Sequence, residues 1–165
     1  MSPIPLPSSP SRVAQQLDLL REFYGQVAIP REVHDEVTVA GAGLPGAEEV
    51  RRASRIQVQP TPSEPSAAVK ASCSGLGVGE RSAIYLASSL SADLVLIDEQ
   101  RARRAAKNVD LSVAGSIAIP EHGSRLKRVA DLRVVYLRLL DQGIRFDYNL
   151  LEARLARLGL AKLKQ

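Results

Sequence analysis

The chain has 165 residues, enough for one domain, since about 150 residues can bury roughly 70% of their unfolded surface. Hydrophobic residues make up 45% of it and charged residues 24%, which is typical of a globular protein. The lone Cys73 excludes an internal disulfide and a cysteine-based zinc site. No apolar run approaches the roughly 18 residues of a membrane span, and MSPIPLPSSPSR does not resemble a secretory signal. We therefore expect a cytoplasmic protein without a membrane partner.

Charge is unevenly distributed along the chain. Residues 1–100 hold 8 Lys and Arg against 12 Asp and Glu, whereas residues 101–165 hold 14 against 6. An acidic half joined to a basic half suits a metal site beside a polyanion track. A C-terminal helical region with a solvated basic face explains the same asymmetry equally well.

The first sixty residues predict short alternating elements. Residues 1–11 carry four prolines, so no regular structure is expected there. Apolar residues at Val13, Leu17 and Leu20, with Gly25 as a stop, indicate an amphipathic helix. The patterns predict helices over 11–24 and 31–40, a further short helix after Pro45 and Gly46, and strands over 26–30 and 55–60.

The rest of the chain continues the alternation and ends in helices. Residues 61–79 read as a loop with one helical turn, and Pro120 and Gly123 predict a turn, since proline inside a helix costs about 3 kcal/mol. The patterns predict helices over 80–90, 101–107, 130–143 and 148–159, and strands over 94–97 and 111–115. Such alternation favours an α/β domain with a parallel sheet.

Asp98 follows the apolar run Leu94–Ile97, at the end of a predicted strand. Ligands of open parallel sheets bind outside the carboxyl ends of the strands, which makes Asp98 a candidate site residue. Capping of the helix that begins near Arg101, by Asp98 or Glu99, is an equally simple interpretation.

Two further acids are candidates. Glu36 lies beside the apolar stripe of Val33 and Val37, where a carboxylate needs a partner or a cation unless it reaches solvent. Glu80 opens a helix, where an acid is favourable by itself by about 0.3–1 kcal/mol. A few dispersed carboxylates are sufficient for Mg²⁺, whereas His34 and His122 have no spaced partner for zinc.

The residues also resemble a known family. LDLLREFYGQVAIPREVHDEV, GLGVGERSAIYLASSLSADLVLIDEQRARRAA and LSVAGS are similar to successive blocks of a PIN-like family, from residue 17 to the C-terminus. The resemblance implies a Rossmann-like parallel sheet flanked by helices. It gives an irregular segment over 1–16, a PIN-like core over 17–120 and a C-terminal helical extension over 121–165.

The resemblance also implies a chemistry and its residues. Active PIN domains hydrolyse single-stranded RNA with Mg²⁺ or Mn²⁺ held by acids, which here would be Glu36, Glu80 and Asp98, supported by Ser116 and Glu99. A bound metal ion would lower the pKa of a water molecule and stabilise charge on the scissile phosphate. On charge alone, the RNA backbone would be held by Arg101, Arg103, Arg104, Arg125, Lys127 and Arg128.

The chain departs from the family at its start. Family members begin with a strand that ends in an Asp of the metal site, but here no acid precedes Asp18. We expect either that the first strand and its ligand are lost or that the chain starts downstream of them.

These observations predict a toxin-type, Mg²⁺- or Mn²⁺-dependent endoribonuclease, a hydrolase of phosphodiester bonds with weak or absent activity. The alternatives are a non-catalytic nucleic-acid-binding module and an interaction protein whose C-terminal helices bind an antitoxin or a second copy of the chain.

Overall fold

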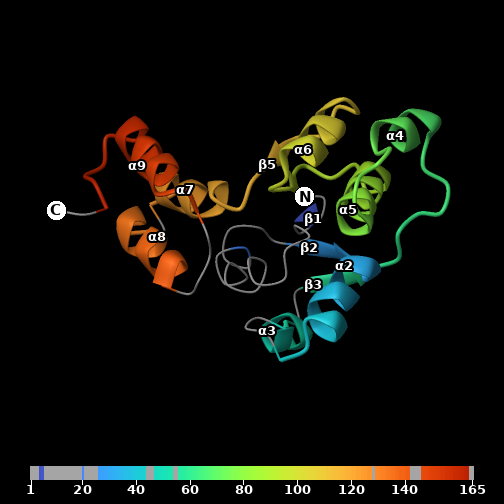
Figure 1. Cartoon of the computed structure of the whole chain (residues 1–165), viewed down its shortest axis with the longest axis horizontal. Coiled ribbons are helices and arrows are strands. Elements are labelled where there is room, and N and C mark those ends of the chain that lie inside the picture. Colours follow the sequence, from blue (N-terminus) through green and yellow to red (C-terminus); the bar gives the residue numbers. More distant parts are fainter. Residues whose placement is uncertain are drawn as a thin grey trace. The chain divides into compact units, whose positions relative to one another are not determined.

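The computed structural model describes residues 4–5, 20, 26–43, 47–53, 56–127, 129–141 and 146–163 (Figure 1). The chain divides into two compact units, residues 1–116 and 117–165. Over the described residues, none of the helices combines the length and the apolar character that a membrane crossing requires. The helix predicted over 11–24 lies outside the described residues except for Leu20, which is helical and buried.

The first unit is built on short parallel strands. They form a sheet in the order β1-β2-β3 and a pair β4-β5, and β1 also lies against β4, so that β1 stands between β2 and β4. The expected α/β fold with a parallel sheet is confirmed, and β3 lies at the edge of its sheet. The strands are β1 (Ile4–Pro5), β2 (Val27–Pro30), β3 (Ile56–Gln59), β4 (Val95–Leu96) and β5 (Val113–Ala114).

The expectation that the first strand is lost was wrong. Ile4 and Pro5 pair in parallel with Val27 and Ala28 of β2. Proline density suggested irregular structure, but a proline is tolerated where a strand ends because the ladder no longer needs its N–H there. The strand is only two residues long, and it carries no acid.

Helices pack against these strands and enclose the core. The buried side chains Ala83, Ile84 and Ala87 face Val95 and Ile97, and α6 contributes alanines to the same cluster. Helix α5 contacts β1, β2 and β4, while α2 contacts β2 and β3. The helices of the first unit are α2 (Arg31–Asp35), α3 (Ala47–Arg52), α4 (Ala67–Ser72), α5 (Val78–Ser89) and α6 (Gln100–Lys107).

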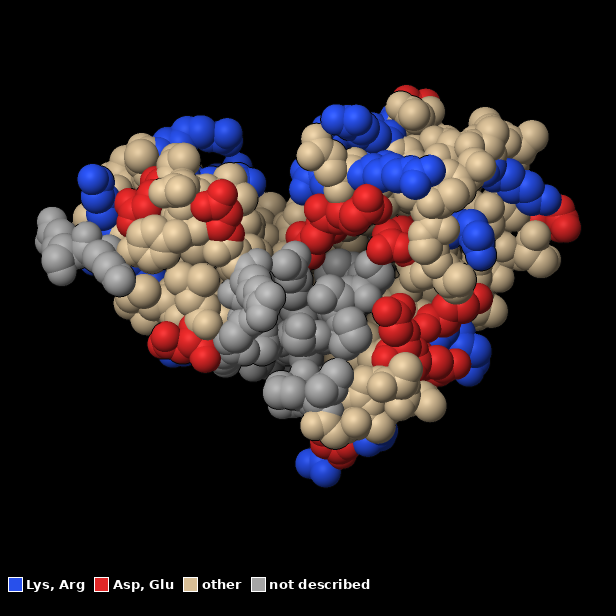
Figure 2. All heavy atoms as spheres, in the orientation of Figure 1, with Lys and Arg blue, Asp and Glu red and all other residues tan. Residues whose placement is uncertain are grey.

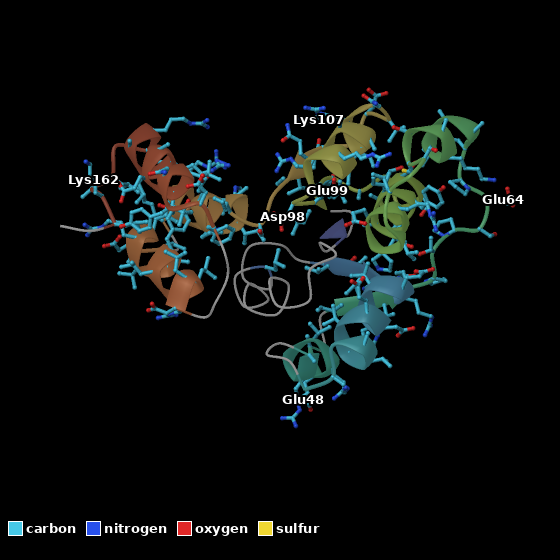
Figure 3. The ribbon with its side chains drawn as sticks, viewed as in Figure 1. Glu48, Glu64, Asp98, Glu99, Lys107 and Lys162 are labelled. Carbon is cyan, nitrogen blue, oxygen red and sulfur yellow. The ribbon has the colours of Figure 1, made fainter. Side chains whose placement is uncertain are left out.

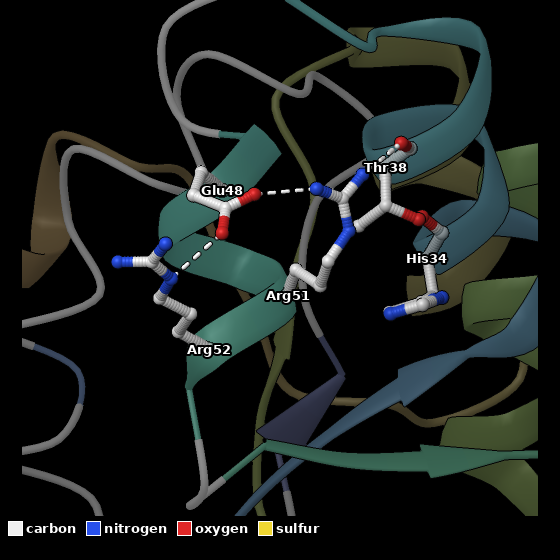
Figure 4. Close-up of polar contacts among 5 residues, drawn as sticks. All are labelled: His34, Thr38, Glu48, Arg51 and Arg52. Carbon is white, nitrogen blue, oxygen red and sulfur yellow. Dashed lines mark hydrogen bonds and ion pairs between the residues drawn. The ribbon is translucent and has the colours of Figure 1, made fainter.

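The helix predicted over 31–40 changes its winding halfway. After α2 the chain continues as a π-helical segment, η1 (Glu36–Ala40), and Gly41 N–H closes it on the Glu36 carbonyl at 2.9 Å. Thr38 donates its hydroxyl to the His34 carbonyl, and Arg51 of α3 donates to the Thr38 carbonyl, both at 2.8 Å (Figure 4). A threonine bonded four residues back tends to bend a helix, which is consistent with the altered winding.

A salt-bridge cluster on α3 supports this segment. Glu48 pairs with Arg51 and with Arg52 (Figure 4). Arg51 therefore connects Glu48 to the backbone of η1. The pairs are exposed, so their direct contribution to stability is small, and their effect is to fix the position of Arg51.

The second unit consists of α7 (Ala118–Arg125), α8 (Leu132–Asp141) and α9 (Tyr148–Arg157). Buried leucines and Tyr136 of α8 pack on Leu151 and Leu155 of α9. The turn predicted at Pro120 and Gly123 was wrong, because α7 runs through both residues. Pro120 lies in the first turn of α7, where a backbone N–H has no intrahelical partner to lose.

A buried charge network joins the three helices of this unit. Tyr136 donates its hydroxyl to Glu121 Oε1 at 2.9 Å, and Arg154 Nη1 donates to Glu121 Oε2 at 3.3 Å. Arg154 Nε also lies 3.2 Å from Glu121 Oε1. Burial, together with the charge of Glu121, raises the pKa of Tyr136 far above its ordinary value, so this hydroxyl stays protonated.

Candidate functional site

The register of β4 and β5 positions the most prominent acid. Val95 N–H donates to the Ser112 carbonyl and Ile97 N–H to the Ala114 carbonyl, each at 2.9 Å. Asp98, which follows Ile97, and Ser116, two residues after Ala114, therefore meet where the two strands end. This is the carboxyl edge of the strands, where open parallel sheets bind ligands.

Asp98 is held by Ser116 in a fixed orientation. The Ser116 N–H and hydroxyl each lie 2.8 Å from Asp98 Oδ1, and the hydroxyl lies 2.9 Å from Oδ2. Ser116 is fully buried, whereas Asp98 is half-buried. Glu99 is the N-cap residue of α6 but makes no side-chain capping bond. Glu99 therefore does not cap α6, and Asp98 is bonded to Ser116 across the strand ends.

Arg103 lies beside this carboxylate. A Cβ atom built on Gly115 would lie 2.7 Å from Arg103 Nη1 and 3.2 Å from Asp98 Oδ1. Both side chains thus occupy the space that a side chain at position 115 would fill. A side chain at position 115 would displace the Arg103 guanidinium from this place.

Asp98 opens onto a cavity of about 450 Å³ along α6, which we call the α6 pocket; it is lined by Asp98, Gln100, Arg103, Arg104 and Lys107. Figure 3 shows Asp98 and Glu99 near the start of α6 and Lys107 at its far end, and Figure 2 shows cationic side chains over this helix with acidic ones beside them. The volume is within the range of about 300–1,000 Å³ found for small-ligand sites. The pocket offers an anion three cationic side chains.

Two residues of the α6 pocket were not among the predicted site residues. Gln100 and Lys107 line it together with Arg103 and Arg104. The signal was present in the sequence, because residues three or four positions apart share one face of a helix. Ala102, Ala105 and Ala106 cover the opposite, buried face.

Arg101 points elsewhere. Its guanidinium donates to the Ser74 carbonyl at 3.4 Å and lies against Gly75, which has a left-handed φ of +70°. Arg101 does not line the α6 pocket, and its observed contacts connect α6 to the loop after α4. A role for Arg101 in RNA binding remains a prediction.

Glu80 lies in the first turn of α5, where a negative charge stabilises the helix. Its carboxylate folds back against Gly77, the N-cap residue, so closely that a Cβ atom there would collide with it. A carboxylate at this position interacts favourably with the unpaired N–H groups of the first turn. This contact agrees with the simpler interpretation of the sequence, in which Glu80 stabilises the start of α5.

Glu36 is exposed at the first residue of η1, while the neighbouring Val33 and Val37 are fully buried. His34, two residues before Glu36, lies 3.2 Å from Asp35. The side chain of Glu36 therefore reaches solvent from the margin of the apolar stripe.

The described side chains do not fit the divalent metal ion that the resemblance implies. Asp98 accepts its bonds from Ser116 next to a guanidinium, and Glu80 lies against Gly77. Within the described ranges, no three acids, histidines or cysteines form a group that could hold a metal ion. Glu36, Glu80 and Asp98 are therefore not gathered into one cluster here.

The remaining predicted residues belong mainly to the second unit. Arg125 and Lys127 are exposed, and Arg128 lies outside the described residues.

Cys73 is buried in the first unit, and burial raises the pKa of its thiol, which makes it a poor nucleophile.

Comparison with known proteins gives one match. No curated protein and no solved structure matches the chain. A family model described as PIN domain matches residues 12–160, which is most of the chain and spans both units. The match agrees with the α/β fold and its short parallel strands. This chain therefore belongs to the PIN-domain family.

Proposed function

We propose that this PIN-domain protein binds single-stranded RNA in the α6 pocket, and that its hydrolytic activity is weak or absent. The family is one of nucleases, which makes a nucleic acid the natural ligand. The observation that carries the proposal is the lining of the pocket, where Arg103, Arg104 and Lys107 adjoin the strand-end carboxylate of Asp98.

Phosphate contacts by lysine and arginine account for most of the affinity of non-specific nucleic-acid binding. Arg104 and Lys107 are exposed and lie about one helical turn apart, so both can approach a flexible single strand. Arg103 is half-buried beside Gly115 and also lines the pocket. A guanidinium binds phosphate with two parallel hydrogen bonds, which favours a defined position for the backbone.

Cleavage is a separate matter from binding. PIN domains are generally dependent on divalent metal ions, and Mg²⁺ or Mn²⁺ is the expected ion. The described acids of this chain form no group that could hold a metal ion. We therefore assign binding to the α6 pocket and expect little cleavage.

The binding test is a salt titration with a short single-stranded RNA, followed by fluorescence anisotropy. The affinity should fall steeply with salt, and Arg104→Ala should weaken binding and lower the slope of log affinity against log salt by about 1. Lys70→Ala is the matched control, because Lys70 is also an exposed cation but pairs with Glu64 and lies outside the pocket. Salt-independent binding, or equal losses in the two variants, would contradict the proposal.

The cleavage test uses the same RNA with Mg²⁺ or Mn²⁺. We expect at most slow cleavage, and any that occurs should be lost in Asp98→Asn. Rapid cleavage by the chain would contradict the expectation that the chain lacks a working metal site. Cleavage that survives in Asp98→Asn would remove Asp98 from the reaction.

A toxin role, with an antitoxin or a second copy of the chain as partner, remains a prediction from the family resemblance. Light scattering of the purified chain, with and without a co-expressed candidate antitoxin, measures both associations. A strict monomer that binds no such partner would exclude this role.

A further inference from the structure

Exposed apolar side chains concentrate on the second unit. Among the described residues, nine large apolar side chains are exposed, and seven of them belong to residues 117–165. Four of the seven, Tyr148, Leu150, Leu158 and Leu160, lie on α9 or within three residues of its end. Single exposed apolar residues are ordinary on a protein surface, but a group of them on one element indicates a surface that binds a partner.

Two of these side chains, Tyr148 and Leu160, line a groove. The groove is a cavity of about 540 Å³ beside α9, which we call the α9 groove, and Lys162 from the segment after the helix also lines it. Ala153 and Ala156 of α9 are exposed in it. Alanine methyl groups are short, so they leave room for a large side chain of a partner.

The charge of the second unit indicates the charge of that partner. Residues 117–165 hold 10 Lys and Arg against 5 Asp and Glu. Glu152, the acid that lines the α9 groove, is half-buried and accepts a hydrogen bond from the Leu163 N–H at 2.8 Å. Lys162 and the nearby Arg157 of α9 are exposed, and within the described part of the chain neither forms an ion pair. These two cations are therefore available to the acids of a partner.

An acidic peptide matches this combination better than other occupants do. A second copy of the chain would bring the same excess of positive charge, and like charges repel. A nucleic acid would match the charge, but alanine side chains offer its phosphates no donor. We propose that the α9 groove docks an acidic peptide segment of another protein, with one large apolar side chain in the groove and carboxylates beside Lys162 and Arg157. This binding is independent of RNA binding in the α6 pocket.

A selection from random peptides tests the chemistry of the partner. The probe is a library of short random peptides displayed on phage and selected on the immobilised full chain. The enriched peptides should be acidic and should share a leucine or an aromatic residue. In the strongest of them, labelled with fluorescein, replacing that residue by serine should weaken binding about tenfold or more, because the burial of its apolar surface is lost. Replacing its acids by their amides should weaken binding further at low salt.

Two variants assign the binding to the groove. Ala156→Gln places a longer side chain in the groove and should weaken binding of the selected peptide about tenfold. Lys162→Ala removes an exposed charge and should weaken it about two- to fivefold at low salt. Ala68→Gln, at an exposed alanine of α4, and Arg104→Ala, in the α6 pocket, should bind the peptide as the wild-type chain does. Thermal unfolding of each variant confirms that it is folded at the assay temperature.

The competing occupants give different results. Enrichment of no peptide, or of peptides without acids, would overturn the inference, and so would equal affinities in Ala156→Gln and Ala68→Gln. A dimer in light scattering that dissociates in Ala156→Gln would overturn it as well, because the groove would then join two copies of the chain. Displacement of the peptide from Arg104→Ala by single-stranded RNA would assign this face to nucleic acid instead. Failure of RNA binding in the α6 pocket would leave this inference intact.

Discussion

The two units use the same pair of chemical groups in different surroundings. In the first unit, Asp98 lies beside Arg103 at the edge of an open pocket. In the second, Glu121 pairs with Arg154 between α7 and α9, and its side chain is only 11% exposed. Each carboxylate also accepts a hydroxyl hydrogen, from Ser116 and from Tyr136 respectively.

The difference in exposure separates a binding role from a structural role. A buried carboxylate must find its partners within the protein, because it cannot be solvated. Glu121 does so with Tyr136 and Arg154, and the three side chains hold three helices together. Asp98 is half-buried on the wall of a cavity with cations beside it, so a ligand can approach it from solvent.

The largest predicted effect comes from removing the buried carboxylate of this comparison, Glu121. Glu121→Ala leaves Arg154 and the buried Tyr136 hydroxyl without their acceptor, which should lower the free energy of unfolding by about 3 kcal/mol. Urea denaturation followed by circular dichroism measures it. RNA affinity at low urea should change little, because Glu121 does not line the α6 pocket.

Glu64→Ala is the control for this prediction. It removes a carboxylate paired with Lys70 at 2.8 Å, but both side chains are exposed, so the unfolding curve should hardly move. If the two variants lose equal stability, burial does not distinguish the ion pairs and the comparison fails.

Much of the first unit could be predicted from the sequence because its pattern is local. The apolar run before Asp98 and the alternating helices gave the strand, helix 101–107 and the parallel sheet. The pairing of Asp98 with Ser116 follows once two consecutive strands are parallel and their ends coincide. Proline density concealed β1, since two residues in a ladder leave almost no periodicity to detect.

The remaining features depend on directions that no sequence pattern encodes. Glu80 lies back against Gly77, and the position of an acid in the first turn of a helix does not by itself indicate that direction. The η1 segment, where Glu36 lies, also accepts a hydrogen bond from Arg51 of another helix, which no local pattern indicates.

A second prediction sharpens the comparison at the pocket. Gly115→Ala places a methyl group where Arg103 and Asp98 meet, so the flexible Arg103 side chain has to move aside, and the free energy of unfolding should fall by at most about 1.5 kcal/mol. It should also weaken RNA binding several-fold, because the Arg103 guanidinium is displaced. Anisotropy and urea denaturation on the same preparation separate the two effects.

Gly41→Ala is the matched variant. Its methyl group would lie 2.5 Å from the Val37 carbonyl oxygen, so it should also lose stability, but Gly41 does not line the α6 pocket. RNA affinity should therefore fall in Gly115→Ala alone. Equal RNA affinities in the two variants would show that the space above Gly115 does not position the binding groups.

The smallest predicted effect concerns the Tyr136 hydroxyl in the buried network of the second unit. Tyr136→Phe removes the bond to Glu121 and should lower the free energy of unfolding by about 1.5 kcal/mol at neutral pH. The pKa of Tyr136 is raised in the folded state, so its contribution is complete below the ordinary tyrosine pKa of 10.0 and is lost as pH rises above it. The difference between wild type and Tyr136→Phe should therefore be constant up to about pH 9 and then shrink by up to about 1.4 kcal/mol per pH unit. Urea denaturation of both chains at several alkaline pH values measures this difference. A difference that stays constant through pH 11 would mean that Tyr136 ionises as it does in the unfolded chain, and that the network of the second unit is open to solvent like the pocket of the first.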